Sequence, residues 1–448
     1  MLFYSTNGQS PKVDLKQALM QGQAPDRGLY MPESFPQIPA GEIAGFAGQS
    51  YPEVAFRVLS AYTDGVVEPE TLRALCEDAY SAFPLPMEPV RGFERTVILR
   101  LDRGPTASFK DFAARMMARL MGLFVREDGG ELTILTATSG DTGAAVASAF
   151  YGVEGIRVRV LFPEKEVSER QRKQMTTLGG NVRSIAVAGK FDDCQALVKR
   201  AFADEVLRGR MRLSSANSIN IGRLLPQSVY YFFAGSRLGR REGAEGLDPV
   251  LFSVPSGNFG DMMGAMIAGR MGLPVVRILA PVNGNDAFPN YLASGEYHKI
   301  EPSRNCISNA MNVGHPSNLA RLVCLYGGQM DETGRIHRQP RLEELRRDVY
   351  SVSVSDEATR AAIRRAYEEN GVCLEPHGAV AWEGFCRYMA ENPGLRVPAA
   401  ILETAHPAKF PQEVARCIGT EPATPPALEN LDNLPESYER MKADFGDF

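Results

Sequence analysis

The 448-residue sequence contains few of the residues that build disulfide-bonded or metal-binding proteins. Its seven cysteines are scattered, and none forms a Cys-x-x-Cys pair. We therefore expect reduced thiols rather than a disulfide framework. Its five histidines never lie four positions apart as they do in zinc proteases. We expect no metal site.

Long apolar runs and a strong charge of one sign are also missing. No stretch approaches the ~18 uninterrupted apolar residues of a membrane span, and the first residues lack the basic and apolar regions of a secretory signal. The 49 Lys and Arg against 54 Asp and Glu give a net charge of −5, which offers no basic footprint for nucleic acid. We predict a cytoplasmic protein without a membrane or nucleic-acid partner.

Short β-branched runs that alternate with helical patterns predict βαβ units and a mostly parallel sheet. The expected strands are 96–99, 132–135, 156–162, 182–187, 250–254, 275–279 and 399–402. The expected helices are 110–124, 141–151, 166–178, 191–207, 222–238, 260–271 and 356–370. The chain is also too long for one ordinary core, so the fold class is α/β with more than one lobe.

The domain organisation follows from shifts in composition. Residues 1–85 carry proline turns and a helical region, and end in the proline-rich Phe83-Pro84-Leu85-Pro86. We read them as an N-terminal, mainly helical domain. Residues 86–420 form the core, with a small lobe at roughly 105–220 and a large lobe in the remainder. Residues 421–448, rich in proline and acids, are expected to pack on the surface as a C-terminal tail.

Lys110 is a candidate reactive amine because it begins a helix after Gly104-Pro105-Thr106-Ala107-Ser108-Phe109. A lysine there opposes the positive end of the helix dipole. Either solvent screens the charge, or the amine is not an ordinary ammonium group. The helix has an apolar stripe, which places Lys110 beside buried surface. A Schiff base to an aldehyde cofactor would remove the conflict.

Two later loops have the composition of anion-binding turns between a strand and a helix. Residues 136–143 contain Ser139, Asp141 and Thr142 between glycines and threonines. Residues 255–261 contain glycines at 257 and 260 but lack the Gly-x-Gly-x-x-Gly spacing of dinucleotide folds. Free amides at a helix start bind phosphate. The alternative for residues 136–143 is an ordinary helix cap by Ser139 or Asp141.

Two further segments bring functional groups to turns. Residues 215–223 place amides, hydroxyls and Arg223 at an expected helix start, although a polar cap would explain them equally well. Residues 401–410 bring Thr404 and His406 to the end of a strand. Together with Lys110, these loops indicate a pyridoxal phosphate enzyme.

Taken together, these stretches resemble the threonine synthases of the longer variety, which have an extra N-terminal domain. The resemblance covers nearly the whole chain and includes Asp26-Arg27-Gly28-Leu29-Tyr30, the lysine segment and Thr404 to Phe410. It implies the pyridoxal phosphate (PLP) fold type II of the tryptophan synthase β-like family. That fold has two lobes, each with a mostly parallel twisted sheet flanked by helices. Long-type members are often monomers, so we expect a monomer or a weak homodimer.

The resemblance also implies roles for individual residues. Lys110 would form the Schiff base and act as the catalytic base. The cofactor would be bound by Lys110, Asp141, Gly257, Asn258, Phe259, Gly260, Asp261 and Thr404, with Thr404 facing the ring nitrogen. The substrate would be bound by Thr106, Ser139, Thr142, Asn217, Ser218, Asn220 and Arg223.

The implied reaction converts O-phospho-L-homoserine and water to L-threonine and phosphate, the final step of threonine biosynthesis. It would pass through an external aldimine and a quinonoid, so the enzyme would be a carbon–oxygen lyase acting on phosphate. The sequence departs from the family pattern at two places. Asp102-Arg103 stands where Phe-His is common, and Asn312 where aspartate is frequent.

Two alternatives stay open. The same chemistry could end in 2-oxobutyrate, which would make the protein a phospho-lyase. The chain could instead be a catalytically silent homologue that binds the cofactor. A serine or threonine dehydratase is less favoured, because it needs no additional phosphate site.

Overall fold

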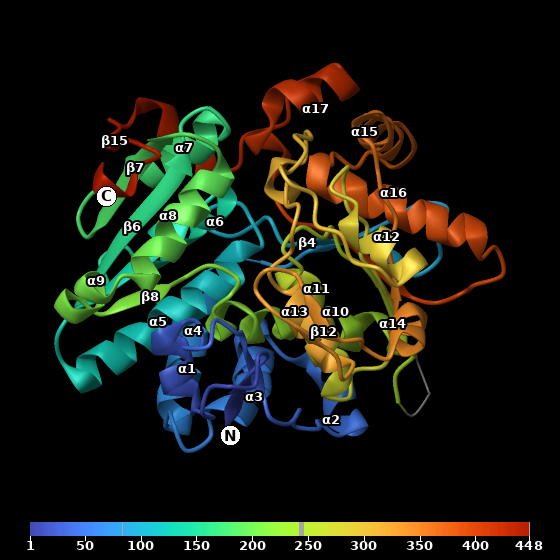
Figure 1. The fold of residues 1–448 in the computed structure, drawn as a ribbon. Coiled ribbons are helices and arrows are strands. Elements are labelled where there is room, and N and C mark those ends of the chain that lie inside the picture. Colours follow the sequence, from blue (N-terminus) through green and yellow to red (C-terminus); the bar gives the residue numbers. More distant parts are fainter. Residues whose placement is uncertain (83, 242–245, 448) are drawn as a thin grey trace.

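The computed structural model describes residues 1–82, 84–241 and 246–447. Phe83, part of the predicted proline-rich linker, and Phe448, the last residue of the predicted tail, lie outside the described residues. Two mostly parallel sheets form two lobes, and an N-terminal helical region lies beneath both (Figure 1). None of the described helices is long and apolar enough to cross a bilayer.

The larger sheet has six strands in the order β13-β10-β9-β14-β4-β3. Only the edge pair β3–β4 is antiparallel. The central strands β4, β9 and β14 are buried along their whole length, as expected for a parallel sheet covered on both faces. The strands are β3 (Met87–Pro89), β4 (Thr96–Arg100), β9 (Val250–Ser253), β10 (Val275–Leu279), β13 (Val349–Tyr350) and β14 (Ala399–Glu403).

The smaller sheet is entirely parallel, in the order β15-β7-β6-β5-β8. Its strands are β5 (Leu132–Ala137), β6 (Ile156–Pro163), β7 (Val182–Ala188), β8 (Leu213–Ser215) and β15 (Glu439–Lys442). Strand β15 comes from the C-terminal tail, which therefore pairs with the sheet edge in addition to lying on the surface. Glu436 secures the tail, because its carboxylate accepts hydrogen bonds from Arg172 at 2.8 and 2.9 Å.

The N-terminal region contains a short antiparallel strand pair and four helices. These are β1 (Phe3–Ser5), α1 (Leu15–Gln21), β2 (Tyr30–Pro32), α2 (Ala40–Gly45), α3 (Tyr51–Thr63) and α4 (Pro69–Tyr80). Helix α3 begins at a capping box in which Ser50 and Glu53 each satisfy the other's backbone amide. The predicted domain limits at residues 85 and 420 stay predictions.

Over the described ranges, the lobes contain helices at all seven predicted positions and five more that were not predicted, at 287–294, 319–325, 342–348, 376–391 and 411–418. In the small lobe they are α5 (Lys110–Asp128), α6 (Asp141–Phe150), α7 (Glu169–Thr176), α8 (Phe191–Ala203) and α9 (Glu205–Arg210). In the large lobe they are α10 (Ser228–Leu238), α11 (Gly260–Arg270), α12 (Ala287–Ser294), α13 (Leu319–Leu325), α14 (Leu342–Asp348), α15 (Asp356–Asn370), α16 (Pro376–Glu391) and α17 (Pro411–Ile418). A small hairpin joins β11 (Gln329–Met330) to β12 (Ile336–Arg338).

Two predicted helices are interrupted in the structure, and others differ at their ends by a few residues, as with the helix expected at 110–124, which runs to Asp128. The helix expected at 191–207 stops at Ala203, because Asp204 is extended and its side chain caps the new helix α9. The helix expected at 222–238 begins as two 3-10 turns, Ile221–Arg223 and Leu225–Gln227, and becomes regular only at Ser228. Pro226 has no amide hydrogen to continue a helix through this region.

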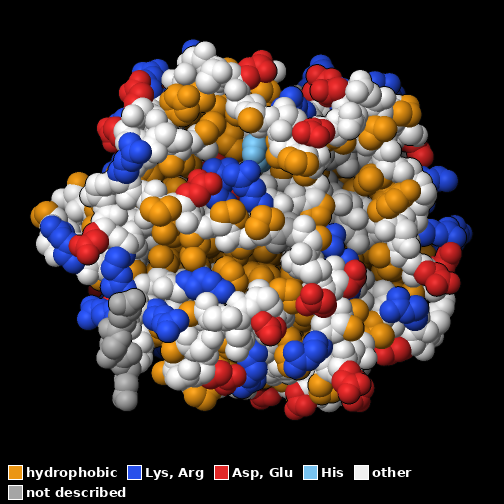
Figure 2. Space-filling view, turned by 180° about the vertical axis from the view of Figure 1, so that it is seen from behind, with side chains coloured by type: hydrophobic (Ala, Val, Ile, Leu, Met, Phe, Trp, Pro, Cys, Tyr) orange, Lys and Arg blue, Asp and Glu red, His pale blue; other side chains and the backbone are white. Residues whose placement is uncertain are grey.

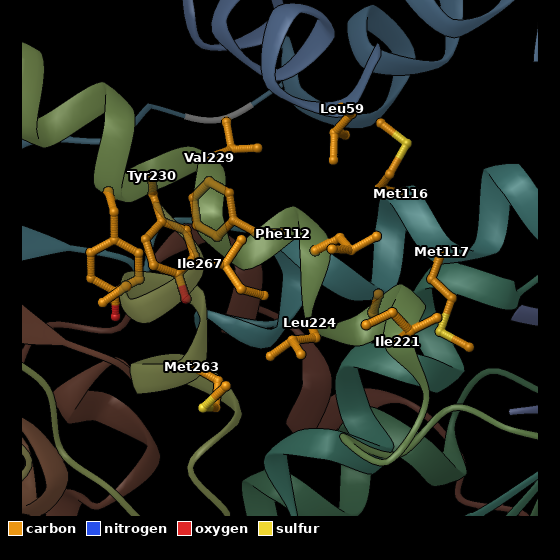
Figure 3. Packing of buried hydrophobic residues seen from close by; sticks show 14 of the residues in the cluster. Leu59, Phe112, Met116, Met117, Ile221, Leu224, Val229, Tyr230, Met263 and Ile267 are labelled. Carbon is orange, nitrogen blue, oxygen red and sulfur yellow. The ribbon is translucent and has the colours of Figure 1, made fainter. Parts of the chain in front are cut away.

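The apolar stripe of α5 is the centre of the main core. Met116 and Met117 are fully buried and lie near Leu59 of α3 and Ile221 (Figure 3). The same cluster extends through Tyr230 of α10 to helix α11. Packing against this core therefore fixes where α5, and Lys110 at its start, lies relative to both lobes.

We predict that Met117→Ala lowers the free energy of unfolding by about 2–5 kcal/mol, because it leaves a cavity beneath α5. The matched control on the same helix is Arg126→Ala, which removes an exposed side chain and should change stability by less than about 0.5 kcal/mol. Urea titration followed by circular dichroism measures both. If the two variants unfolded at the same urea concentration, the central position of α5 in the core would be contradicted.

Candidate active site

The lysine loop, residues 104–109, is held by the chain that follows β14. The amide of Phe109 donates to the carbonyl of Thr404 at 2.9 Å, and the amide of His406 donates to the carbonyl of Ala107 at 3.0 Å. Ala107 has a left-handed backbone with φ of 54°. These bonds place Lys110 and Thr404 side by side at the carboxyl ends of β4 and β14, where ligands of such sheets bind.

Contacts with Asp111 also hold the lysine loop in place. Asp111 accepts hydrogen bonds from the amide and the hydroxyl of Thr106, at 2.8 and 2.6 Å. A Cβ atom at Gly104 would lie 2.4 Å from the Asp111 carboxylate, so only glycine allows this close approach. Thr106 is buried and does not line the pocket described below.

The amine of Lys110 lies in a largely buried environment. Its side chain is 13% exposed, and Nζ lies 3.9 Å from Oδ2 of Asp141. Burial lowers the pKa of Lys110; Asp141 opposes this shift, and the charges of Lys409 and Arg223 add to it. The amine therefore holds its proton less tightly than an exposed lysine does, consistent with the conflict expected at a helix start.

The loop between β5 and α6 forms the first anion-binding surface. The hydroxyl of Thr138 accepts the amides of Gly140 and Gly143 at 2.9 and 2.8 Å. Thr138 thus provides the helix cap that the sequence suggested for Ser139 or Asp141. Within the described chain, the amides of Ser139, Asp141 and Thr142 donate to no acceptor. They are free to bind a ligand.

The loop between β9 and α11 forms the second anion-binding surface. Phe259 is left-handed, with φ of 63°, and turns the chain into α11. The amides of residues 257–262 make no hydrogen bond to any described acceptor. A Cβ atom at Gly257 would lie only 3.0 Å from Cα of Met311. These free amides at a helix start fit a phosphate group.

Asp261 lies at the same helix start with an unusual environment for a carboxyl group. Its Oδ1 accepts hydrogen bonds from the hydroxyls of Tyr230 and Tyr231, at 2.5 and 2.6 Å. Its Oδ2 is buried without a partner in the described chain. Burial raises the pKa of Asp261 to about 6, although both tyrosines and Lys110 oppose the shift.

Arg223 supplies a buried positive charge without a carboxylate partner in the described chain. Nη1 donates to the carbonyl of Ala216 at 2.7 Å, whereas Nε is buried and unpaired. Burial lowers the pKa of Arg223 to about 10, so the guanidinium stays charged at neutral pH. A buried cation that lacks a partner is a suitable site for an anion.

One pocket joins these features. Most of the predicted site residues line it: Lys110, Ser139, Asp141, Thr142, Asn217, Ser218, Arg223, Gly257, Asn258, Phe259, Gly260, Asp261 and Thr404. Thr106 and Asn220 do not. The side chain of Asn220 is buried and bonded to the carbonyls of Leu19 and Ser215, both at 2.9 Å.

Sequence reasoning missed several polar residues at or beside the pocket, among them Gln227 in its lining and four that form one cluster. The four are His377, which lines the pocket, and Glu375, Lys409 and Gln171 behind the lining. His377 Nδ1 lies 2.5 Å from Glu375, and its Nε2 accepts the amide of Ala310 at 3.0 Å. The only available signal was the Glu375-Pro376-His377 sequence, which combines an N-cap residue with proline at the first helical position.

The two departures from the family pattern lie outside the pocket lining. Asp102 is buried and pairs with Arg100, and Arg103 lies 3.6 Å from Glu88. Asn312 accepts the side-chain amide of Asn283 at 2.9 Å and so helps to fold its own loop. Among the described residues, no group of acids, cysteines and histidines is placed to hold a metal ion.

Comparison with known proteins decides the family. A family model described as "Pyridoxal-phosphate dependent enzyme" matches residues 83–399, and models of the threonine synthase N terminus and C-terminal region match residues 2–80 and 378–447. Threonine synthase from Haemophilus influenzae is 40% identical over 99% of this chain and 98% of its own length. The chain belongs to the threonine synthase family.

Solved structures of the family agree with this assignment. The crystal structure of PLP-bound threonine synthase from Brucella melitensis is 34% identical, with a TM-score of 0.91 over 100% of this chain and 97% of that one. Threonine synthase from Escherichia coli is 35% identical, with a TM-score of 0.88 over 100% and 98%. These matches confirm the predicted resemblance, the PLP fold type II architecture and pyridoxal phosphate as the cofactor.

We predict that ionisation of Asp261 lowers the free energy of unfolding of this threonine synthase family member as pH rises. The folded protein keeps the Asp261 proton up to about pH 6, whereas the unfolded chain loses it near pH 4. Above about pH 6, burying the ionised carboxylate lowers the free energy of unfolding by up to about 3 kcal/mol. Below about pH 4 this cost is absent, because the carboxyl group is protonated in both states. From about pH 4 to about pH 6, the free energy of unfolding of the cofactor-free parent protein should therefore fall relative to that of the cofactor-free Asp261→Asn variant.

Chemical denaturation of both proteins at several pH values measures this difference. Hydrogen bonds that asparagine makes or loses are independent of pH, so they shift the whole curve without changing its slope. Parallel curves from pH 4 to 7 would rule out a proton on Asp261.

Proposed function

We propose that the protein converts O-phospho-L-homoserine and water into L-threonine and inorganic phosphate. The observation that carries this proposal is a single pocket in which one lysine amine lies between two sets of free backbone amides. Arg223 adds a positive charge without a carboxylate partner in the described chain. A phosphorylated cofactor and a phosphorylated substrate together need two anion sites, whereas a dehydratase acting on a hydroxyl amino acid needs one.

The β9–α11 surface fits the cofactor phosphate. Its free amides at the helix start can donate to a phosphate, and the missing side chain at Gly257 lets the loop pack against the backbone of Met311. We assign Gly257, Asn258, Phe259, Gly260 and Asp261 to this phosphate. Lys110 would hold the cofactor aldehyde. When bound, pyridoxal phosphate supplies an electron-withdrawing ring that stabilises negative charge on adjacent substrate carbons.

Thr404 and Asp141 would complete the cofactor site. The hydroxyl of Thr404 is neutral, so it can share a hydrogen bond with the ring nitrogen without adding charge to the ring. Asp141 is ionised, because Lys409 and Lys110 lower its pKa although burial alone would raise it. We assign it to the same site because it faces the amine of Lys110.

The β5–α6 surface and Arg223 would bind the substrate. The amides of Ser139 and Thr142 and the guanidinium of Arg223 would hold the substrate phosphate, with Asn217 and Ser218 on the same wall. Thr106 and Asn220, which do not line the pocket, would support this set. Thr106 holds the lysine loop through Asp111, and Asn220 caps the turn that carries Arg223.

Lys110 would move protons within this pocket. Burial lowers the pKa of Lys110, which favours the free amine that can accept a proton, and its position at the cofactor would place it next to the substrate Cα. In the net reaction phosphate leaves Cγ and a proton is added to Cγ, while Cβ loses one proton and gains a hydroxyl group from water. The buried walls around Lys110 exclude other water from these carbons.

We propose further that the protein acts in the cytoplasm as a monomer or weak homodimer without nucleic-acid partners. All seven cysteines are free, which suits a reducing compartment. Acidic and basic side chains are interspersed over the face in Figure 2. Such a face offers no extended basic surface for nucleic acid.

We predict that the purified protein with pyridoxal phosphate releases threonine and phosphate in equal amounts from O-phospho-L-homoserine. Chromatography separates threonine from 2-oxobutyrate, and a colorimetric assay measures phosphate. Lys110→Ala should abolish both turnover and the visible absorbance of the protein-bound cofactor.

Each other outcome identifies a different function. Oxobutyrate as the sole organic product would identify the phospho-lyase. A cofactor spectrum that depends on Lys110, with no turnover, would identify the silent homologue. An unchanged spectrum in Lys110→Ala would refute the assignment of the lysine.

We predict that Arg223→Met raises the KM for O-phospho-L-homoserine by about tenfold to a hundredfold, because it removes a charged hydrogen bond to phosphate. Inhibition by inorganic phosphate should weaken by a similar factor. Arg159→Met is the control, since Arg159 is a partly buried arginine that lies on β6 outside the lining of this pocket. Equal phosphate inhibition in the two variants would contradict the role of Arg223.

A further inference from the structure

A second lysine lies behind the pocket. Lys409 ends the 3-10 turn Pro407–Lys409, and its side chain is fully buried. Its Nζ lies 2.7 Å from Oδ1 of Asp141 and donates to the carbonyl of Thr106 at 2.9 Å. A buried ammonium group is costly unless it is paired in this way, so the pairing indicates that Lys409 is charged.

Asp141 is unequally shared between the two lysines. Its Oδ1 accepts Lys409 at 2.7 Å and the side-chain amide of Gln171 at 3.0 Å. Its Oδ2 lies 3.9 Å from Nζ of Lys110, beyond hydrogen-bond distance. Within the described chain, Lys110 therefore has no carboxylate hydrogen bond that would hold it as an ammonium group.

We infer that Lys409 is a positioning residue that keeps the amine of Lys110 free of its extra proton. It does so by occupying the Asp141 carboxylate and by placing a second positive charge nearby. The inference rests on the proposed function, because an unprotonated amine matters only if Lys110 reacts with an aldehyde.

The charges around Lys110 agree with this inference. Asp141 and Glu375 favour the ammonium form, and Lys409 and Arg223 oppose it. Asp261 also interacts with Lys110, and His377 lines the same pocket. His377 is neutral in its hydrogen-bonding arrangement, since its Nε2 accepts the amide of Ala310. Without Lys409, one of the positive charges that oppose protonation of Lys110 would be missing, and the carboxylates would remain.

The protonation state of Lys110 determines whether its nitrogen has a lone pair for reaction with an aldehyde. The nitrogen of Lys110 adds to the aldehyde carbon, the new C–N bond becomes C=N, and one water molecule leaves with the aldehyde oxygen. An ammonium group has no lone pair for this addition. The pH at which the reaction reaches half its maximal rate therefore reports the pKa of Lys110.

The test mixes cofactor-free protein with pyridoxal phosphate over a series of pH values and follows imine formation by visible absorbance. In Lys409→Met, the free Asp141 carboxylate should pair with Lys110, so the midpoint should move to higher pH. For every pH unit by which the midpoint rises, the rate at neutral pH should fall about tenfold. Lys409→Arg keeps the charge and should retain a midpoint close to that of the parent.

Two variants separate this role from a merely structural one. Lys409→Met combined with Asp141→Asn should have a lower midpoint than Lys409→Met, because no carboxylate remains to pair with Lys110. Asp141→Asn by itself should have a midpoint no higher than the parent, and it tests the inference even if Lys409→Met does not fold.

The opposite results would overturn the inference. These are an unchanged midpoint in folded Lys409→Met, a midpoint in Lys409→Arg as high as in Lys409→Met, or a raised midpoint in Asp141→Asn. Failure of the proposed function is distinguishable, because the turnover assay with O-phospho-L-homoserine measures it separately from imine formation.

Discussion

The site depends on the backbone hydrogen bonds between the lysine loop and the chain after β14. Through them the amide of Phe109 and the carbonyl of Ala107 hold Thr404 and His406 next to Lys110. Strands β4 and β14 are adjacent and parallel, so both loops leave the same edge of the sheet. The lysine helix α5 then crosses to the smaller lobe. The pairing of β4 with β14 in the larger sheet therefore helps to determine where the two lobes join.

The pocket contains more unsatisfied polar groups than a core of this kind normally tolerates. The free amides of two loops, Nε of Arg223 and Oδ2 of Asp261 have no partners in the described chain. Each buried unsatisfied group costs about 1–3 kcal/mol. A phosphate ligand would satisfy the donors among them, so binding and folding are coupled, and the protein with its cofactor should be more stable than the protein alone.

Local sequence signals predicted the elements whose neighbours in sequence determine them. The helix that begins at Lys110 and the strand Ala399–Glu403 each have a strong pattern within a few residues. Helix α16 (Pro376–Glu391) was missed, although Glu375 caps it. Strand β15 was missed because it is short and exposed. It becomes a strand only by pairing with β7, which is distant in the sequence.

The sequence by itself determined the fold class, the position of Lys110 at a helix start and the two glycine-containing loops, because helix starts and strand ends are set by residues close together in the chain. Only the tertiary structure decided which charges meet. Asp141 and Lys409 are far apart in sequence, yet they form a buried ion pair beside Lys110. Thr138 takes the capping role that leaves Ser139 free. Such pairings depend on how two sheets dock against one core, and no local pattern encodes that arrangement.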